Sequence, residues 1–89
     1  MKILKFKLEI TDEQAVKMPI QSKILTAQFQ GDNLCIWAVC DLSLPQRYRY
    51  FAVVGTGNPF YHKKNTYIAT VQNELFVWHV FEIDKSKTT

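Results

Sequence analysis

The sequence predicts a small all-β protein, either an antiparallel sandwich or a partly open barrel of about seven strands. Apolar and polar residues alternate with a period of two through most of the 89-residue chain, as they do in half-buried strands. Short clusters of Gly, Pro, Asn and Asp separate the alternating segments, and these residue types favour turns. The chain carries no convincing amphipathic helix, so strands and turns account for its organisation.

Length and composition fit one domain with one core. A chain of 89 residues is long enough to bury a single core and too short to bury two. A hydrophobic fraction of 47% with a charged fraction of 21% is ordinary for a folded globule. We expect a single β domain over residues 1–84, followed by a flexible C-terminal tail over residues 85–89.

The first two segments predict a half-buried strand and an edge strand. Residues 4–10 alternate apolar residues with charged ones, as in a strand with one buried face. The apolar face of this strand consists of Leu4, Phe6, Leu8 and Ile10. Residues 11–14 predict a turn, or a capped helical turn that begins at Thr11. The short extended segment 14–18 ends at Pro19, which has no N–H to donate, so we expect an edge strand.

The next two segments predict a hairpin. Residues 23–30 and 34–41 are joined by Gly-Asp-Asn, whose residue types suit a turn with positive φ. Both faces of residues 34–41 carry apolar side chains, so we expect this strand to be central. Its two cysteines, Cys35 and Cys40, have an odd spacing that directs them to opposite faces. We therefore expect both to be reduced and mostly buried, without a disulfide or a zinc site.

The second half of the chain predicts three further strands, over residues 47–54, 67–72 and 75–83. The last two are consistent with a hairpin that turns at Asn73-Glu74. The last strand places His79 on a face with apolar neighbours. A histidine in such a row is more often a core residue with hydrogen-bonded ring nitrogens than a catalyst.

The two tryptophans are predicted to point outward. Trp37 and Trp78 lie opposite the faces of Ile36 and Val77, respectively, in their strands. On outer faces they would pack against a second layer or form an interface. Aromatic residues in such positions favour self-association.

The longest connection, residues 55–66, is the candidate functional segment, because a connection of this length in a small domain is more often functional than incidental. Its first residues read Gly-Thr-Gly-Asn-Pro, and Gly55 and Gly57 mark either a tight turn or a close approach to the main chain. Consecutive N–H groups in such a turn can form an anion-binding nest. The spacing matches neither a P-loop nor a dinucleotide fingerprint. A structural turn or bulge and a ligand-contacting loop both remain open.

The rest of this connection adds groups that suit a nucleotide. An aromatic ring, an imidazole and two cations could stack on a base and neutralise a phosphate, and the alternative is a solvated polar loop. The candidate ligand-binding residues are Gly55, Thr56, Gly57, Asn58, Tyr61, His62, Lys63 and Lys64. No nucleophile is spaced suitably from a base and an orienting acid, so we expect no catalytic residues, and we assign no metal or cofactor.

The charge and hydropathy of the chain indicate which classes of partner it can have. A formal charge of +3 and a pI near 9.0 favour acidic partners over basic ones. No basic recognition helix or aromatic RNA-binding motif is visible, which argues against nucleic acid. No apolar run approaches the roughly 20 residues that cross a bilayer, and the first segment lacks a signal-peptide core. We expect a cytoplasmic protein without a membrane partner.

Six segments occur in a distinctive order along the chain. They are KLEITDEQAVKMP, KILTAQFQ, LCIWAVCD, VVGTGNP, YIATVQ and LFVWHVFE, and they extend from Lys7 to Glu82. In this order, and above all in the GTG-x-P and VWHVFE signatures, the chain resembles a family of small, uncharacterised bacteriophage and prophage proteins. The resemblance implies a phage context in a bacterial host cell and implies no reaction.

Together these observations predict a non-enzymatic binding protein of phage origin. It would act on a host factor or sequester a small anionic, nucleotide-like ligand. The alternative is a structural or assembly module that oligomerises through strand edges and outer-face tryptophans. An enzyme of nucleotide metabolism that uses His62 or His79 is a third and less favoured hypothesis.

Overall fold

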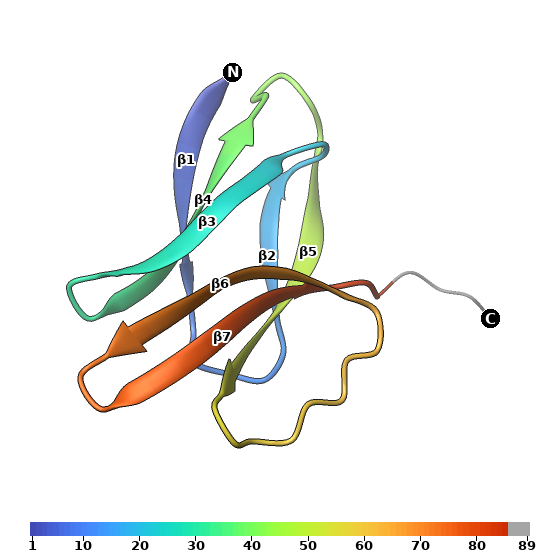
Figure 1. The fold of residues 1–89 in the computed structure, drawn as a ribbon. Helices are drawn as coiled ribbons and strands as arrows, with labels where there is room; N and C mark the ends of the chain where they lie inside the picture. Colours follow the sequence, from blue (N-terminus) through green and yellow to red (C-terminus); the bar gives the residue numbers. More distant parts are fainter. Residues whose placement is uncertain (86–89) are drawn as a thin grey trace.

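The computed structural model describes residues 1–85 as seven strands in two antiparallel sheets (Figure 1). Sheet A contains, in spatial order, β1 (Lys2–Leu8), β4 (Asn33–Cys40) and β3 (Lys23–Gln30). Sheet B contains β2 (Gln14–Pro19), β5 (Gln46–Gly55), β7 (Phe76–Ile83) and β6 (Asn65–Asn73). The two sheets form a sandwich-like arrangement and do not close into a barrel. The predicted all-β fold is confirmed.

Most of the predicted strand roles are confirmed as well. β2 is an edge strand of sheet B, and β4 is the central strand of sheet A. The hairpins β3–β4 and β6–β7 both form, although the second one turns at Glu74-Leu75 and not at Asn73-Glu74. Cys35 and Cys40 are free and buried, as expected.

The C-terminal tail predicted over residues 85–89 lies outside the described residues except for Lys85. The Lys85 ammonium is 2.6 Å from the Glu13 carboxylate, and this hydrogen bond raises the pKa of Lys85. Both side chains are substantially exposed, so the ion pair contributes little to stability. Within residues 1–85, no helix could cross a membrane.

The main core lies between the inner faces of the two sheets. Its buried side chains are Leu8, Ala27, Leu34 and Ile36 from sheet A, and Met18, Phe51, Val53, Val71 and Val80 from sheet B. Each large apolar side chain that is fully buried here stabilises the fold by roughly 1.5–3 kcal/mol relative to exposure. The buried side chains of each strand alternate with residues that face away from the main core.

β5 is buried on both faces. Phe51 and Val53 belong to the main core, and Ala52 and Val54 on the opposite face form a second, smaller cluster with Ile83. Residues 56–64, which we call the connector, lie against the outer face of sheet B. Phe60 of the connector packs on Phe81 of β7 with ring centroids 4.8 Å apart. The longest connection in the chain thus helps to cover a second apolar face.

The predicted position of Ile10 in the first apolar face is wrong. β1 ends at Leu8, and Ile10 is 44% exposed in the bend that follows. The Gln14 side chain accepts a hydrogen bond from the Glu9 N–H and donates one to the Glu9 carbonyl. These two bonds satisfy the Glu9 backbone locally, so the chain leaves the sheet two residues earlier than the alternation indicates.

The predicted outer position of Trp78 is also wrong. Trp78 lies on the inner face of β7, where it packs against the main core and stacks on Phe76. Both faces of β7 carry apolar residues, so the alternation alone does not identify the buried one. Trp37 lies on the outer face of sheet A, opposite the buried Ile36, as predicted.

Candidate functional site

The Gly-Thr-Gly-Asn segment forms a tight turn at the end of β5. The Asn58 N–H donates to the Gly55 carbonyl at 3.0 Å, and Gly57 at the third position of this turn has φ +90°. This is the geometry of a type II turn, which requires positive φ at that position. The Thr56 N–H donates to the Val77 carbonyl at 3.2 Å. Two of the amides that would form an anion nest are therefore engaged within the protein.

Gly55 is required by the close approach of Trp78. A Cβ at position 55 would lie 3.1 Å from the Trp78 ring and 2.9 Å from Nδ2 of Asn58. Gly57, in contrast, has open space around the position of a Cβ. The structure thus gives the two glycines separate roles, close packing for Gly55 and backbone conformation for Gly57.

We expect Gly55→Ala to lower the free energy of unfolding by about 1–3 kcal/mol, because the added methyl group overpacks the site against Trp78. Urea unfolding measures the loss. Gly57→Ala is the matched control, since it strains the backbone without touching Trp78. With Trp37 replaced by Phe in both variants, the remaining Trp78 emission should shift only in Gly55→Ala. An unchanged emission there would contradict the packing role of Gly55.

His79 lies outside the main core, in a chain of hydrogen bonds beside the connector. Its Nε2 is 2.7 Å from Oγ1 of Thr56, and its Nδ1 is 3.1 Å from Oγ1 of Thr70. The Tyr67 hydroxyl continues the chain to Thr70 at 2.7 Å. Both ring nitrogens of His79 are hydrogen-bonded, as expected, and the chain joins the connector to sheet B.

Of the other candidate residues of the connector, Tyr61 lines a cavity of about 350 Å³ together with Asn58 and Trp78. Tyr61 is 75% exposed, and Nε2 of His62 is 3.3 Å from a carboxylate oxygen of Asp12. Lys63 and Lys64 are exposed, and the Lys64 carbonyl accepts the N–H of Asp84.

The turn and the two lysines occupy opposite ends of β7. Gly55 pairs with Trp78, whereas the Lys64 carbonyl accepts a hydrogen bond from Asp84. Asp84 follows Trp78 by six residues. At the rise of a strand this separation is about 20 Å. The structure therefore separates the two lysines from the glycine turn, whereas Asn58 and Tyr61 line one cavity beside Trp78. It does not gather all eight candidate residues around one ligand.

A continuous exposed surface lies on the outer face of sheet A. A β-bulge in β3 between Ile24 and Thr26 turns Leu25 outward, where it is 44% exposed beside Trp37 of β4. Ile3 of β1 is 62% exposed and pairs with Val39. We call the surface formed by Ile3, Leu25, Trp37 and Val39 the apolar stripe.

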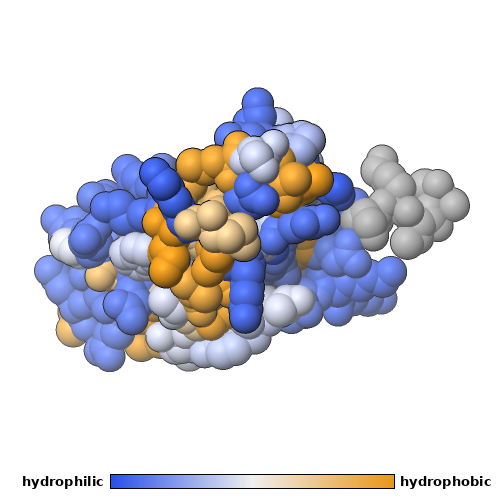
Figure 2. Space-filling model, turned by 90° about the horizontal axis from the view of Figure 1, so that it is seen from above, coloured by the Kyte–Doolittle hydropathy of each residue, from blue (hydrophilic) through white to orange (hydrophobic). Residues whose placement is uncertain are grey.

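Apolar side chains are also exposed at one end of the molecule. Viewed from above, apolar side chains gather where β1 begins and the β4–β5 loop crosses (Figure 2). From this region Met1 is 83% exposed and Leu42 is 54% exposed. Exposed apolar side chains that form a contiguous patch are typical of a surface that another molecule covers.

Lysines surround the apolar stripe without carboxylates among them. The three strands of sheet A contain Lys2, Lys5, Lys7 and Lys23 and no Asp or Glu. Lys5 donates to the neutral amide of Gln30, and Lys7 is 4.0 Å from Glu9 in the bend after β1. Sheet A is therefore a basic face, although the chain as a whole has a charge of only +3.

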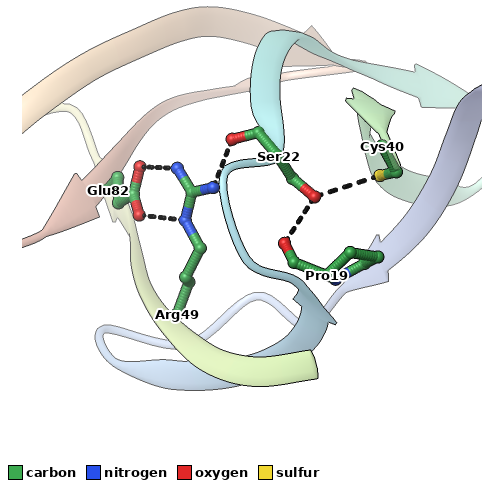
Figure 3. A network of polar contacts seen from close by, with 5 residues as sticks. All are labelled: Pro19, Ser22, Cys40, Arg49 and Glu82. Carbon is green, nitrogen blue, oxygen red and sulfur yellow. Dashed lines mark hydrogen bonds and ion pairs between the residues drawn. The ribbon is translucent and has the colours of Figure 1, made fainter. Parts of the chain in front are cut away.

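A polar network that the sequence analysis did not predict lies at one end of the sandwich (Figure 3). Arg49 of β5 donates to both carboxylate oxygens of Glu82 in β7, at 2.6 and 2.7 Å, and also to the Ser22 carbonyl. The Ser22 hydroxyl donates to the Pro19 carbonyl at 2.6 Å and lies 3.2 Å from Sγ of Cys40. The hydrogen bonds to Glu82 raise the pKa of Arg49. The network ties β5 and β7 to the β2–β3 turn and to β4.

The sequence contained a signal for this network. Arg49 belongs to the same strand face as the buried Phe51 and Val53, and Glu82 to the same face as Val80. Opposite charges on the apolar faces of two strands predict an ion pair if the strands are neighbours. Residues 1–85 contain no group of three or more His, Cys, Asp or Glu side chains placed to hold a metal ion.

Comparisons with known proteins identify a family and no function. A family model described as a domain of unknown function, DUF7352, matches residues 1–89. No curated protein and no solved structure matches the chain.

Proposed function

The chain belongs to the DUF7352 family of domains of unknown function, and we propose that it is a non-enzymatic, protein-binding module. It docks the outer face of sheet A onto an acidic surface of another protein. With the phage context that the sequence resemblance implies, that partner is a host protein in the bacterial cytoplasm.

The single observation that carries this proposal is the combination of the apolar stripe with a rim of lysines. Trp37 lies in the central strand, and tryptophan is enriched among the residues that dominate binding energies. Lys5, Lys7 and Lys23 flank it on β1 and β3. Such a rim accelerates association with an acidic surface and disfavours basic ones.

The same charges argue against self-association through this face. Two copies that met through the outer face of sheet A would bring six lysines together, twice the three on that face (Lys5, Lys7 and Lys23), and no carboxylate of these strands would lie between them. Like charges across an interface cost several kcal/mol when they are desolvated. A partner of opposite charge is therefore favoured over a second copy of the chain.

Sheet A is small for a stable interface. Three strands of about eight residues give a face of roughly 15 by 25 Å. That area is well below the roughly 800 Å² per partner of a standard interface, even with the exposed residues at the end of the molecule. We therefore expect a salt-sensitive complex of moderate affinity, made with a short acidic segment of the partner.

Charge reversal tests the proposal. We expect the double variant Lys5→Glu, Lys23→Glu to weaken capture of host proteins at low salt by about tenfold or more, because it inverts the rim. The matched control is Lys17→Glu, Lys63→Glu, which makes the same charge change on sheet B and the connector. Cross-linking followed by mass spectrometry identifies the captured protein and locates its contacts.

The proposal requires three results together. Cross-links should map to sheet A, the sheet A variant should lose them, and the control variant should keep them. Equal loss in both variants would indicate non-specific attraction to a basic protein and would contradict the proposal. Cross-links confined to sheet B or the connector would contradict it as well.

A further inference from the structure

A cavity lies at the start of β5, away from the outer face of sheet A. It has a volume of about 460 Å³, and the residues of β5 that line it are Arg47, Tyr48, Arg49 and Tyr50. β5 pairs with β7 only from Tyr50 onward, so its first residues extend past the end of β7. The cavity lies between these first residues of β5 and the segment that follows β7. Its volume is in the range of small-molecule sites.

Arg49 is held rigidly in the wall of this cavity. Its guanidinium group carries five N–H donors, and three of them bond to Glu82 and Ser22 within residues 1–85. The Glu82 carboxylate uses both oxygens for Arg49 (Figure 3). Arg49 therefore has donors left for a ligand, and Glu82 is already neutralised by its partner.

Arg47 supplies a second guanidinium group on the same face of β5. Its side chain is exposed and makes no hydrogen bond or ion pair with any residue from 1 to 85. Two residues along a strand separate it from Arg49, a distance of about 7 Å. Two arginines at this spacing can converge on one phosphate group, which their planar forks recognise well.

The remaining lining sets the charge balance and the size of the ligand. Lys85 is a third cation, paired with Glu13, and Asp84 is a carboxylate that has its own interaction. The hydroxyl of Thr66 adds a hydrogen-bonding group. A bare phosphate would fill only a small part of the volume, whereas a phosphate attached to a ring would use the tyrosine side chains as well.

We propose that this cavity binds a small phosphate monoester that carries an aromatic ring, of the mononucleotide class. Its phosphate accepts hydrogen bonds from Arg47 and Arg49, which share one face of β5. Tyr48 and Tyr50 lie on the opposite face, and the ring reaches one of them around the edge of β5 beyond the end of β7, where all four residues line the cavity. The site shares no residue with the candidate residues of the connector or with the apolar stripe. It therefore stands independently of the proposed protein partner.

Titration followed by ¹H–¹⁵N NMR tests the proposal, with adenosine monophosphate, adenosine and inorganic phosphate as separate probes at low salt. We expect adenosine monophosphate to bind more tightly than either part alone and to shift the amides of residues 47–50 and 82–85. Arg47→Gln should raise its Kd by about tenfold or more, because a charge-assisted hydrogen bond is lost. Lys63→Gln, in the connector, is the matched control and should leave the Kd unchanged.

Each other outcome overturns the proposal. These outcomes are the absence of shifts up to millimolar ligand, shifts confined to residues 55–64, and an equal Kd for the two variants. An affinity for phosphate or adenosine that equals that for the nucleotide would exclude a mononucleotide site. Arg47 is exposed and unpaired in residues 1–85, so its substitution should preserve the fold, and a thermal unfolding curve of Arg47→Gln checks this.

Discussion

Glu82→Ala is expected to lower the free energy of unfolding by about 2–3 kcal/mol, which is a large part of the stability of a small domain. The substitution leaves Arg49 without its carboxylate at a position where the side chain is only 22% exposed. Removing one partner of a fully buried ion pair costs about 3–5 kcal/mol, and the partial exposure of this pair reduces that figure. Urea unfolding of the wild type and the variant measures the difference.

A double-mutant cycle separates the ion pair from the packing of its side chains. The cycle compares the single variants Arg49→Leu and Glu82→Leu with the double variant. The double variant should recover much of the stability that either single variant loses, because neither charge then remains unpaired. The matched control is Glu13→Ala, which breaks the exposed ion pair with Lys85 and should leave the free energy of unfolding nearly unchanged. A loss for Glu82→Ala no larger than that of the control would contradict the structural role of the network.

The polar network explains why removal of the Glu82 carboxylate should destabilise more than its immediate surroundings. Arg49 also donates to the Ser22 carbonyl, and Ser22 is the one buried polar residue among the described residues. The turn that contains Ser22 carries the chain from β2 in sheet B to β3 in sheet A. Loss of the carboxylate frees Arg49 to move and so loosens a connection between the two sheets.

The alternation of residues was sufficient to predict the fold class and most strand ends to within about one residue. It failed where both faces of a strand are apolar. β7 is the clearest example, since Val77, Phe81 and Ile83 oppose Trp78 and Val80. Which face is buried depends on which neighbours the strand acquires, and spacing along the chain does not contain that information. The position of Ile10 failed for a different reason, because a side-chain hydrogen bond from Gln14 ended the strand early.

The candidate residues of the connector illustrate a second limit. The sequence groups them because they are adjacent in the chain, whereas the structure places the glycine turn and the two lysines at opposite ends of β7. The residues of the apolar stripe, in contrast, are distant in the chain and are brought together by the fold. They come from β1, β3 and β4, and Leu25 joins them only through a β-bulge that no alternation predicts. The basic character of sheet A, in contrast, could have been counted from the sequence once the strand order was known.

Trp37→Ala is expected to raise the Kd for the captured host protein by about thirtyfold, because a central tryptophan of an interface commonly contributes about 2 kcal/mol or more. Trp37 is half-buried beside Leu25 and opposite the lysines of β1, so a partner that covers it displaces water from the centre of the apolar stripe. Fluorescence anisotropy with the labelled partner measures the affinity. The remaining Trp78, which packs against the main core, reports whether the variant is folded.

Two comparisons distinguish this role of Trp37 from a general effect on the surface. Tyr61→Ala removes an aromatic side chain that is 75% exposed on the connector, and it should leave the Kd unchanged. The salt dependence of binding should persist in Trp37→Ala, because the lysine rim is intact, and it should be largely lost in Lys5→Glu, Lys23→Glu. A folded Trp37→Ala variant that binds as tightly as the wild type would place the interface elsewhere, since the lysines alone attract an acidic surface without fixing its position.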